Sequence, residues 1–354
     1  MRVGLSLLTL VPGVVGGSET YARELCRALA RVGELEYAVF VPTIAPGAGD
    51  GLPTTIVPEY RARTTTAGRL AAMSLATAMA KPVRRHFDRA DLTALHFPLS
   101  VMIPRVDAPP PLTTVHDLQH ELYPAFFSRA ELAYRRAVYG WTVKRSRLII
   151  AISEHARSTL LERYGLPPER VHTIRLGIDH AQFTPDSRER EPFLLYPANR
   201  WPHKNHGRLF DAFALVRRER PELRLILTGQ GHDRARLPEA AESRGHVTSD
   251  ELLDLYRRAG CLVFPSLYEG FGLPPLEAMA CGCPVASSNA TSLPEVCGDA
   301  AEYFDPLSTE DMAAAILRAL DGRLVERGLA RAAAFTWDAC ARAHDAVYRD
   351  VASA

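Results

Sequence analysis

Two glutamates enclose a turn that is rich in glycine and proline. Glu269 and Glu277 lie in the stretch YEGFGLPPLEA (268–278), directly after the apolar run CLVFPSL. Because glycine permits a tight turn and proline suits the first positions of a helix, this stretch predicts a strand that turns into a helix. Backbone amides left free at the start of that helix would carry partial positive charge and favour an anion. The amides in question belong to Phe271, Gly272 and Leu273.

The two carboxylates need partners other than this anion, because they would repel it. An ionised carboxylate only accepts hydrogen bonds, so hydroxyl groups are its natural partners. With a diphosphate at the helix start, Glu277 would lie in the first turn of the helix, on the side of a ribose, and Glu269 would reach the opposite end of the ligand. A ligand with hydroxyls at both ends and a diphosphate in the middle is a nucleotide sugar.

A second loop offers cations for the same diphosphate. The segment FLLYPANRWPHKNH (193–206) places Asn199, Arg200 and Lys204 between a strand and a helix. Two cations there suit diphosphate oxygens, and a solvated basic turn is the alternative. Either Asn199 or Arg200 could hold the position beside Lys204. Gly229, which follows the apolar run RLILT, is a further candidate for donor binding.

The first apolar run also leads into glycines. Gly16 and Gly17 precede an amphipathic helix, for which Ser18 is the expected N-cap. Glycines there would let backbone amides approach an anion, although a tight turn needs glycine in any case. The sequence has neither a GKS/GKT P-loop nor a GxGxxG fingerprint, which disfavours ATP hydrolysis and dinucleotide redox chemistry.

A histidine ends another apolar run. His116 and Asp117 close the run LTTVHD (112–117), where the histidine either faces a ligand crevice or makes local hydrogen bonds. His120 lies four residues further on, so a metal-binding pair is conceivable. The loop-like DLQ between the two histidines does not fix them on one helical face. We therefore expect no metal site.

The elements that position these residues alternate regularly. Continuous apolar strands between helical patterns indicate parallel sheets covered on both faces. The pattern pauses at GIDHAQFTPDSREREPF (177–193), a polar stretch with two prolines. We therefore expect an α/β protein with two doubly wound, Rossmann-like domains, residues 1–178 and 179–337, followed by a last helix at 338–354. Ligands of such sheets bind beyond the carboxyl ends of the strands.

Composition excludes several classes of function. At 354 residues the chain is longer than one hydrophobic core usually serves. With 42 basic and 41 acidic residues, the net charge of +1 gives no electrostatic footprint for nucleic acid. The six irregularly spaced cysteines indicate reduced thiols in a cytoplasmic protein. A zinc site on Cys281 and Cys283 is disfavoured, because small buried thiols explain this pair in a helix-to-strand turn.

Two hydrophobic segments could concern a membrane. The N-terminal stretch is interrupted by polar residues and proline, so we expect a strand rather than a signal peptide. Residues 67–87 (AGRLAAMSLATAMAKPVRRHF) are too short an apolar stretch to span a bilayer, which needs ~20 residues. They predict an amphipathic helix whose basic end either is solvated or makes a peripheral contact with the inner surface of the membrane.

The segment YEGFGLPPLEAMACGCPVASSNATSLPEVCGDAAEYFDP (268–306) resembles the signature of the family-four retaining glycosyltransferases of GT-B fold. Their motif is a glutamate, seven residues and a second glutamate. The resemblance is specific from about residue 145 to 306 and extends to the final FTWDACARAHDAVYRDV (335–351), whereas residues 40–110 match poorly. It implies a GT-B fold, in which two Rossmann-like domains face a central crevice.

The resemblance assigns roles in the second domain. Glu269 would contact hydroxyls of the transferred sugar, and Glu277 would hold the ribose. Arg200 and Lys204 would clamp the diphosphate, although family members often have a longer gap between these cations. Val247 would offer its backbone to the base. These residues, with Asn199, Gly229 and the turn 271–273, form the expected donor site.

It also assigns roles in the first domain. Gly16 and Gly17 would face the phosphates, and His116 would lie near the sugar in the crevice. The last helix, entered near Trp337, would cross back to the N-terminal domain. The implied chemistry is transfer with retention of anomeric configuration, in which the leaving phosphate helps to deprotonate the acceptor. The sequence contains no Asp-x-Asp, which agrees with a metal-independent enzyme.

The sequence leaves the substrates and two rival functions open. The stretches WPHKNH and HDLQHELYP are similar to those of mannosyl- and rhamnosyltransferases, which favours GDP-mannose or a deoxysugar donor over other UDP- or dTDP-sugars. The acceptor would be a hydroxyl of a glycan, a lipid-linked compound or a natural product. A nucleotide-sugar epimerase of GT-B fold, or a non-catalytic nucleotide-sugar-binding module, would share the same donor site.

Overall fold

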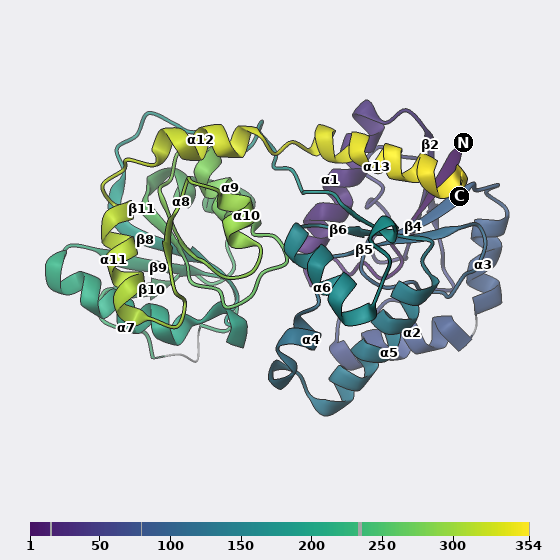
Figure 1. Cartoon of the computed structure of the whole chain (residues 1–354), viewed down its shortest axis with the longest axis horizontal. Coiled ribbons are helices and arrows are strands. Elements are labelled where there is room, and N and C mark those ends of the chain that lie inside the picture. The colour runs from purple at the N-terminus through teal and green to yellow at the C-terminus, as the bar shows by residue number, and fades with distance from the viewer. Residues whose placement is uncertain (15, 79, 233–235, 354) are drawn as a thin grey trace. The chain divides into compact units, whose positions relative to one another are not determined.

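The structure is a computed structural model that describes residues 1–14, 16–78, 80–232 and 236–353. The chain divides into two compact units. One consists of Met1–Gly177 with Trp337–Ala354, and the other of Ile178–Thr336. Each unit is built on a parallel sheet that helices flank (Figure 1). The expected α/β class with two doubly wound sheets is therefore confirmed.

The described part of the first unit holds a seven-stranded sheet with the order β3-β2-β1-β4-β5-β6-β7. Strands β4, β5 and β6 are buried at every position, as is typical of parallel strands covered on both faces. The strands are β1 (Arg2–Ser6), β2 (Glu36–Val41), β3 (Thr54–Ile56), β4 (Ala94–Phe97), β5 (Pro111–Val115), β6 (Leu148–Ala151) and β7 (Val171–Thr173).

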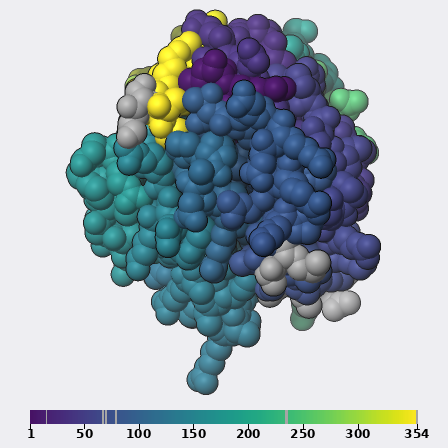
Figure 2. Space-filling model, turned by 90° about the vertical axis from the view of Figure 1, so that its right-hand side faces the viewer, coloured from purple at the N-terminus to yellow at the C-terminus, as the bar shows by residue number. Residues whose placement is uncertain are grey.

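Helices from both ends of the chain cover this sheet. They are α1 (Gly17–Val32), α2 (Thr66–Ala78), α3 (Ala80–Asp88), α4 (Gln119–Leu122), α5 (Arg129–Arg145), α6 (Glu154–Tyr164) and α13 (Trp337–Ser353). The C-terminal helix α13 packs along α1, and Figure 2 shows it on the surface beside the N-terminal segment. The segment expected as one helix at 67–87 corresponds to α2 and α3; residue 79 between them lies outside the described residues. Across the described ranges, the helices are too short or too polar to cross a membrane.

A buried chain of hydrogen bonds fastens α13 to the sheet. His344 Nδ1 lies 2.8 Å from the carbonyl oxygen of Cys340, which only accepts, so Nδ1 carries the proton. The other ring nitrogen of the neutral histidine then accepts from the Tyr21 hydroxyl, 2.8 Å away on α1. The Tyr21 oxygen in turn lies 2.8 Å from Thr114 Oγ1 of β5. Two further hydrogen bonds of 2.8 Å complete the chain. One lies between Thr114 and His96, and the other lies between His96 and Tyr348 of α13.

The described part of the second unit holds a six-stranded sheet with the order β10-β9-β8-β11-β12-β13. The strands are β8 (Glu191–Pro197), β9 (Arg224–Thr228), β10 (Ala241–Ser243), β11 (Ala259–Phe264), β12 (Val285–Ser288) and β13 (Glu302–Phe304). The helices are α7 (His206–Glu219), α8 (Ser249–Arg258), α9 (Leu273–Ala280), α10 (Leu293–Cys297), α11 (Thr309–Ala319) and α12 (Val325–Ala333). Central strands β8 and β11 neighbour each other, so the loops after them meet at one edge of the sheet.

Two local expectations were wrong. Helix α1 begins at Gly17 and its N-cap is Gly16, so Ser18 is the second helical residue and makes no capping bond. Helix α9 begins at Leu273, which places Glu277 at the start of the second turn rather than in the first. In both cases glycine with positive φ ends the preceding turn, and the helix starts directly after it.

Candidate functional site

The turn between β11 and α9 has a conformation that only glycine fits. Gly272, the N-cap of α9, has φ of 119°. A Cβ atom at this position would lie 2.8 Å from Leu293 Cδ2, which is closer than real Cβ contacts. An L side chain rarely adopts this backbone conformation, so the turn requires glycine at position 272.

A buried serine holds this turn in place. Ser292 is fully buried, and its hydroxyl lies 2.7 Å from the Phe271 carbonyl oxygen and 3.0 Å from that of Glu269. Thr291 adds a hydrogen bond of 3.0 Å to the Glu269 amide. Phe271 is buried against Phe335, with ring centroids 5.9 Å apart. The turn is therefore preorganised by the loop that precedes α10.

The preorganised turn presents free backbone donors. Within the described ranges, the amides of Phe271, Gly272 and Leu273 have no acceptor. Unpaired amides at a helix N-terminus are the general form of an anion-binding site. Pro274 follows in the first turn of α9 and has no backbone N–H to donate. The three amides at the start of α9 are thus available to an acceptor from outside the protein.

Lys204 and Glu269 form an ion pair at the same edge of the sheet. Lys204 Nζ lies 2.6 Å from Glu269 Oε1, and the two side chains are 13% and 15% exposed. The ammonium group also lies 5.3 Å from the centroid of the Phe264 ring, the last residue of β11. From the sequence, phosphate is the expected partner of the lysine, and sugar hydroxyls are the expected partners of the glutamate. In the structure each is the charged partner of the other.

Hydrogen bonds hold the loop that carries Lys204 in place. The carbonyl oxygen of Lys204 accepts from the Tyr196 hydroxyl at 2.8 Å. The next residue, Asn205, is buried with φ of 58° and donates through its side chain to the carbonyl oxygens of Pro265 and Pro306, at 3.1 and 2.7 Å. The loops after β8, β11 and β13 are therefore joined by one asparagine, which fixes Lys204 relative to the turn.

The structure separates the two candidates beside Lys204. Asn199 Oδ1 accepts from the Gln230 amide at 2.7 Å, so this side chain holds the loop after β9. The Arg200 backbone amide donates to the Gln230 carbonyl oxygen at 2.9 Å, and its side chain is exposed. No acceptor for the Arg200 guanidinium group lies among residues 1–14, 16–78, 80–232 and 236–353. Within these ranges Arg200 thus has a free guanidinium group, whereas the side-chain oxygen of Asn199 is paired within the protein.

Glu277 bonds to a tyrosine on a neighbouring helix. The Tyr256 hydroxyl of α8 donates to Glu277 Oε2 at 2.9 Å. Burial raises the pKa of Glu277 to about 7, and the hydrogen bond from Tyr256 partly opposes that rise by stabilising the carboxylate. This carboxyl group therefore changes charge near neutral pH.

A pocket of about 440 Å³ lies beyond the ends of β9 and β10. Gly229 has φ of 104°, and a Cβ there would lie 2.7 Å from the Ala198 carbonyl carbon, so close approach of the loops after β8 and β9 requires glycine. Val247 follows the pocket, and its backbone has no partner in the part of the chain that the structure describes. The pocket is lined by Gly229, Gln230, Gly231, His232, Ser243, Arg244, Gly245 and His246.

The candidate residues of the first unit lie at the carboxyl ends of its strands. Gly16 has φ of 54°, and a Cβ atom on Gly16 or Gly17 would meet nothing within 4 Å, so the start of α1 is open. Glu19 in the first turn accepts from the Gly13 amide at 2.7 Å. This bond joins Gly13 to the first turn of α1.

His116 is a buried neutral histidine after β5. Its Nε2 lies 2.7 Å from the Pro98 carbonyl oxygen, which only accepts, so this nitrogen is protonated. Burial lowers the pKa of His116, and the bond to Pro98 partly opposes that effect. Its ring meets the Tyr21 ring edge-on, with centroids 4.9 Å apart. His120 lies buried against Tyr139, and the described residues contain no cluster of three metal-ligating side chains.

Sequence reasoning missed the residues that hold the site together. Four of them, Ser292, Tyr196, Asn205 and Tyr256, are buried, and each bonds to a residue eight or more positions away in sequence. Nothing in their local sequence distinguishes them from ordinary core residues.

Comparison with known proteins identifies the family. Residues 15–182 match the family described as Glycosyltransferase Family 4, and residues 178–334 match Glycosyl transferases group 1. O-antigen chain mannosyltransferase B of Escherichia coli is 33% identical over 256 residues, which are 65% of this chain and 67% of that protein. The chain belongs to glycosyltransferase family 4.

Further relatives agree with this assignment. The MMP alpha-(1->4)-mannosyltransferase of Mycolicibacterium hassiacum is 31% identical over 268 residues, which are 68% of this chain and 65% of that protein. The chain thus matches about two thirds of the length of each of these mannosyltransferases. Among solved structures, sucrose-phosphate synthase from Thermosynechococcus elongatus has a TM-score of 0.77 at 19% identity, with 99% of both chains covered. This glycosyltransferase therefore has the GT-B fold.

Proposed function

We propose that this glycosyltransferase moves a mannosyl residue from a nucleoside diphosphate sugar to a hydroxyl of a glycan, with retention of anomeric configuration and without a metal ion. The observation that carries the proposal is the set of three free amides at the start of α9 beside the Lys204–Glu269 pair. The mannosyltransferase relatives support mannose as the sugar. We also propose that the protein is located in the cytoplasm and that the basic helix α3 makes a peripheral contact with the inner membrane surface.

The donor would bind along the carboxyl edge of the second sheet. The diphosphate would accept from the amides of 271–273 and from Lys204 and Arg200. Glu277 would accept from the ribose hydroxyls, and Glu269 from hydroxyls of the transferred sugar. The base would occupy the pocket beside Gly229, with the Val247 backbone as a partner.

Catalysis would depend mainly on charge at the leaving diphosphate. Fixed donors contribute most where charge develops in the transition state, and these donors are preorganised by Ser292 and Asn205. The leaving phosphate would take the proton of the acceptor hydroxyl on the same face of the sugar. His116, Gly16 and Gly17 are proposed to serve the same reaction from the first unit. A neutral His116 protonated at Nε2 has Nδ1 as its remaining acceptor.

The test is transfer with a defined donor. The protein is incubated with GDP-mannose and, in a parallel reaction, with UDP-glucose as the competing donor. Each donor is tested with a mannose disaccharide as acceptor and without any acceptor. The proposal expects a new α-linked trisaccharide from GDP-mannose, whose anomeric configuration NMR identifies as that of the donor. An epimeric nucleotide sugar formed without acceptor would favour the epimerase alternative. Binding of the donor without any product would favour the non-catalytic module.

A further inference from the structure

Tyr256 occupies one oxygen of Glu277 and leaves the other available. The tyrosine is completely buried in α8, and its hydroxyl lies 2.9 Å from Glu277 Oε2. For the Glu277 side chain, Tyr256 is the hydrogen-bond partner found within the described ranges. A carboxylate with one oxygen fixed by a rigid donor has lost most of its rotational freedom, so its second oxygen has a defined direction.

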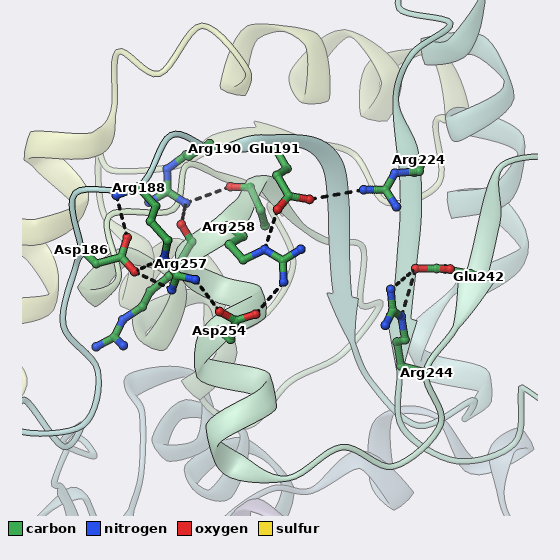
Figure 3. Close-up of polar contacts among 11 residues, drawn as sticks. Asp186, Arg188, Arg190, Glu191, Arg224, Glu242, Arg244, Asp254, Arg257 and Arg258 are labelled. Atoms are coloured by element: carbon green, nitrogen blue, oxygen red, sulfur yellow. Dashed lines mark hydrogen bonds and ion pairs between the residues drawn. The ribbon is translucent and has the colours of Figure 1, made fainter.

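The two helices that carry this pair are fastened together by one arginine. Arg190, in the segment before β8, donates through one terminal nitrogen to the carbonyl oxygens of Tyr256 and Ala259, at 3.1 and 2.8 Å. Its other terminal nitrogen donates to the Cys281 carbonyl oxygen at 2.8 Å, directly after α9. Figure 3 shows Arg190 among the charged residues around α8. The carboxyl ends of α8 and α9 therefore share one guanidinium group.

The amino end of α8 is equally well defined. Thr248 accepts from the Glu251 amide at 3.2 Å, and the Glu251 side chain accepts from the Thr248 amide at 2.7 Å, a complete capping box. On the outer face of α8, Arg258 lies between Asp254 and Glu191 (Figure 3), with bonds of 2.7 and 2.6 Å. A helix fixed at both ends and on its outer face holds the Tyr256 ring in one place.

We propose that Tyr256 is a positioning residue for donor binding: it holds Glu277 Oε2 so that Oε1 faces the hydroxyls of the donor ribose. This inference rests on the proposed function, in which Glu277 binds the ribose. The alternative is that Glu277 only satisfies the buried hydroxyl of Tyr256, because a buried tyrosine usually finds a hydrogen-bond partner. The two possibilities differ in what removal of the hydroxyl does to recognition of ribose.

The decisive variant is Tyr256→Phe, which removes one oxygen and keeps the ring. The matched control is Tyr303→Phe in β13, because the Tyr303 hydroxyl also makes one hydrogen bond, 2.6 Å from the Gly298 carbonyl oxygen, outside the proposed site. Calorimetric titration compares three probes with each protein: GDP, 2′,3′-dideoxy-GDP and inorganic diphosphate. Calorimetry separates affinity from the fraction of active protein, so partial unfolding does not imitate a change in Kd.

We expect wild-type protein to bind GDP at least tenfold more tightly than the dideoxy analogue, because one or two hydrogen bonds are lost. In Tyr256→Phe this preference should fall to within about threefold, while affinity for inorganic diphosphate stays within about twofold of wild type. Tyr303→Phe should keep the full preference. A preference that persists in Tyr256→Phe, or an equal loss with inorganic diphosphate, would overturn the positioning role alone. No ribose preference in the wild-type protein would overturn the role proposed for Glu277 as well.

Discussion

The ammonium group of Lys204 and the carboxylate of Glu269 are 2.6 Å apart and largely shielded from water. A diphosphate that binds to Lys204 must therefore compete with a carboxylate already in place. The two roles expected from the sequence, phosphate for the lysine and sugar hydroxyls for the glutamate, are coupled through this contact. Binding of the donor would exchange one charged partner of Lys204 for another.

This coupling predicts opposite effects of two substitutions on diphosphate binding. Glu269→Gln removes the competing charge, so affinity for inorganic diphosphate should rise about two- to tenfold, while turnover with the sugar donor falls. Lys204→Ala should lower kcat/KM by more than about tenfold, because a charge-assisted bond to the leaving group contributes ~1.5–3 kcal/mol. Calorimetry with inorganic diphosphate and steady-state kinetics measure the two effects. Lower diphosphate affinity in Glu269→Gln would show that the pair is needed to orient the lysine.

Removal of metal ions should leave activity intact. The positive groups proposed to bind the diphosphate belong to the protein: three amides, Lys204 and Arg200. The sequence also lacks an Asp-x-Asp pair with which a metal-bound diphosphate is normally held. Initial rates with and without EDTA, followed by addition of Mn²⁺ or Mg²⁺, test this directly. A rate that collapses with EDTA and returns with either ion would require a metal in the mechanism.

The central elements of both sheets follow from the sequence, whereas the edges do not. Strands such as β6 and β11 are buried runs of apolar residues, and a parallel sheet covered on both faces requires that pattern. The edge strands β3, β7, β10 and β13 have three residues each, too few to show any periodicity. Strand β3 is also exposed along its whole length, so burial leaves no mark on its sequence.

The same contrast applies to the site. The glycines at 229 and 272 could be recognised because a turn needs their backbone conformation, and they follow apolar runs that predict strands. The partnership of Lys204 with Glu269, and of Tyr256 with Glu277, could not be recognised. Each joins residues on separate elements, and it depends on how strands and helices pack rather than on local sequence.

Protonation of Glu277 predicts how stability changes with pH. Its pKa is raised by burial to about 7, above the ~4.3 expected in the unfolded chain, so the folded state binds more protons between these values. The contribution of Glu277 to the free energy of unfolding is fully present below the pKa of this carboxyl group in the unfolded chain. It is lost as pH rises through about 7. The side chain of Glu277→Gln cannot ionise. The free energy of unfolding of this variant minus that of wild type should therefore be about 1–3 kcal/mol higher at pH 8 than at pH 5. Thermal melting at both pH values measures this, with the exposed Glu219→Gln as control. A pH-independent difference between wild type and Glu277→Gln would contradict the prediction.

The buried histidines of the α13 network predict sensitivity to acid. Burial lowers the pKa of His344 to about 4, below the ~6.5 of an unfolded histidine, and the bond to Cys340 partly opposes this. The unfolded chain therefore binds more protons, and stability is complete above pH 6.5 and falls as pH decreases toward 4. Tyr21, Tyr348, Cys340 and the neutral His96 surround this ring, so no carboxylate in the hydrogen-bond chain compensates for protonation. Melting temperatures between pH 7 and 4.5 should fall less steeply for His344→Gln than for wild type, and parallel curves would rule out this titration.

The turn at Gly272 predicts a loss of both stability and anion binding from a single methyl group. In Gly272→Ala the new Cβ must move away from Leu293 while the backbone keeps φ near 119°, a conformation that alanine rarely adopts. Together these should cost about 1–3 kcal/mol of unfolding free energy, and relaxation of the turn should misdirect the amides of 271–273. Gly207→Ala is the matched control, because Gly207 lies exposed in α7 with ordinary φ and nothing within 4 Å of a Cβ. It should be neutral or slightly stabilising. Denaturant unfolding and titration with inorganic diphosphate distinguish the two variants. A Gly272→Ala protein that loses stability but binds diphosphate normally would show that the amides of the turn are not part of the anion site.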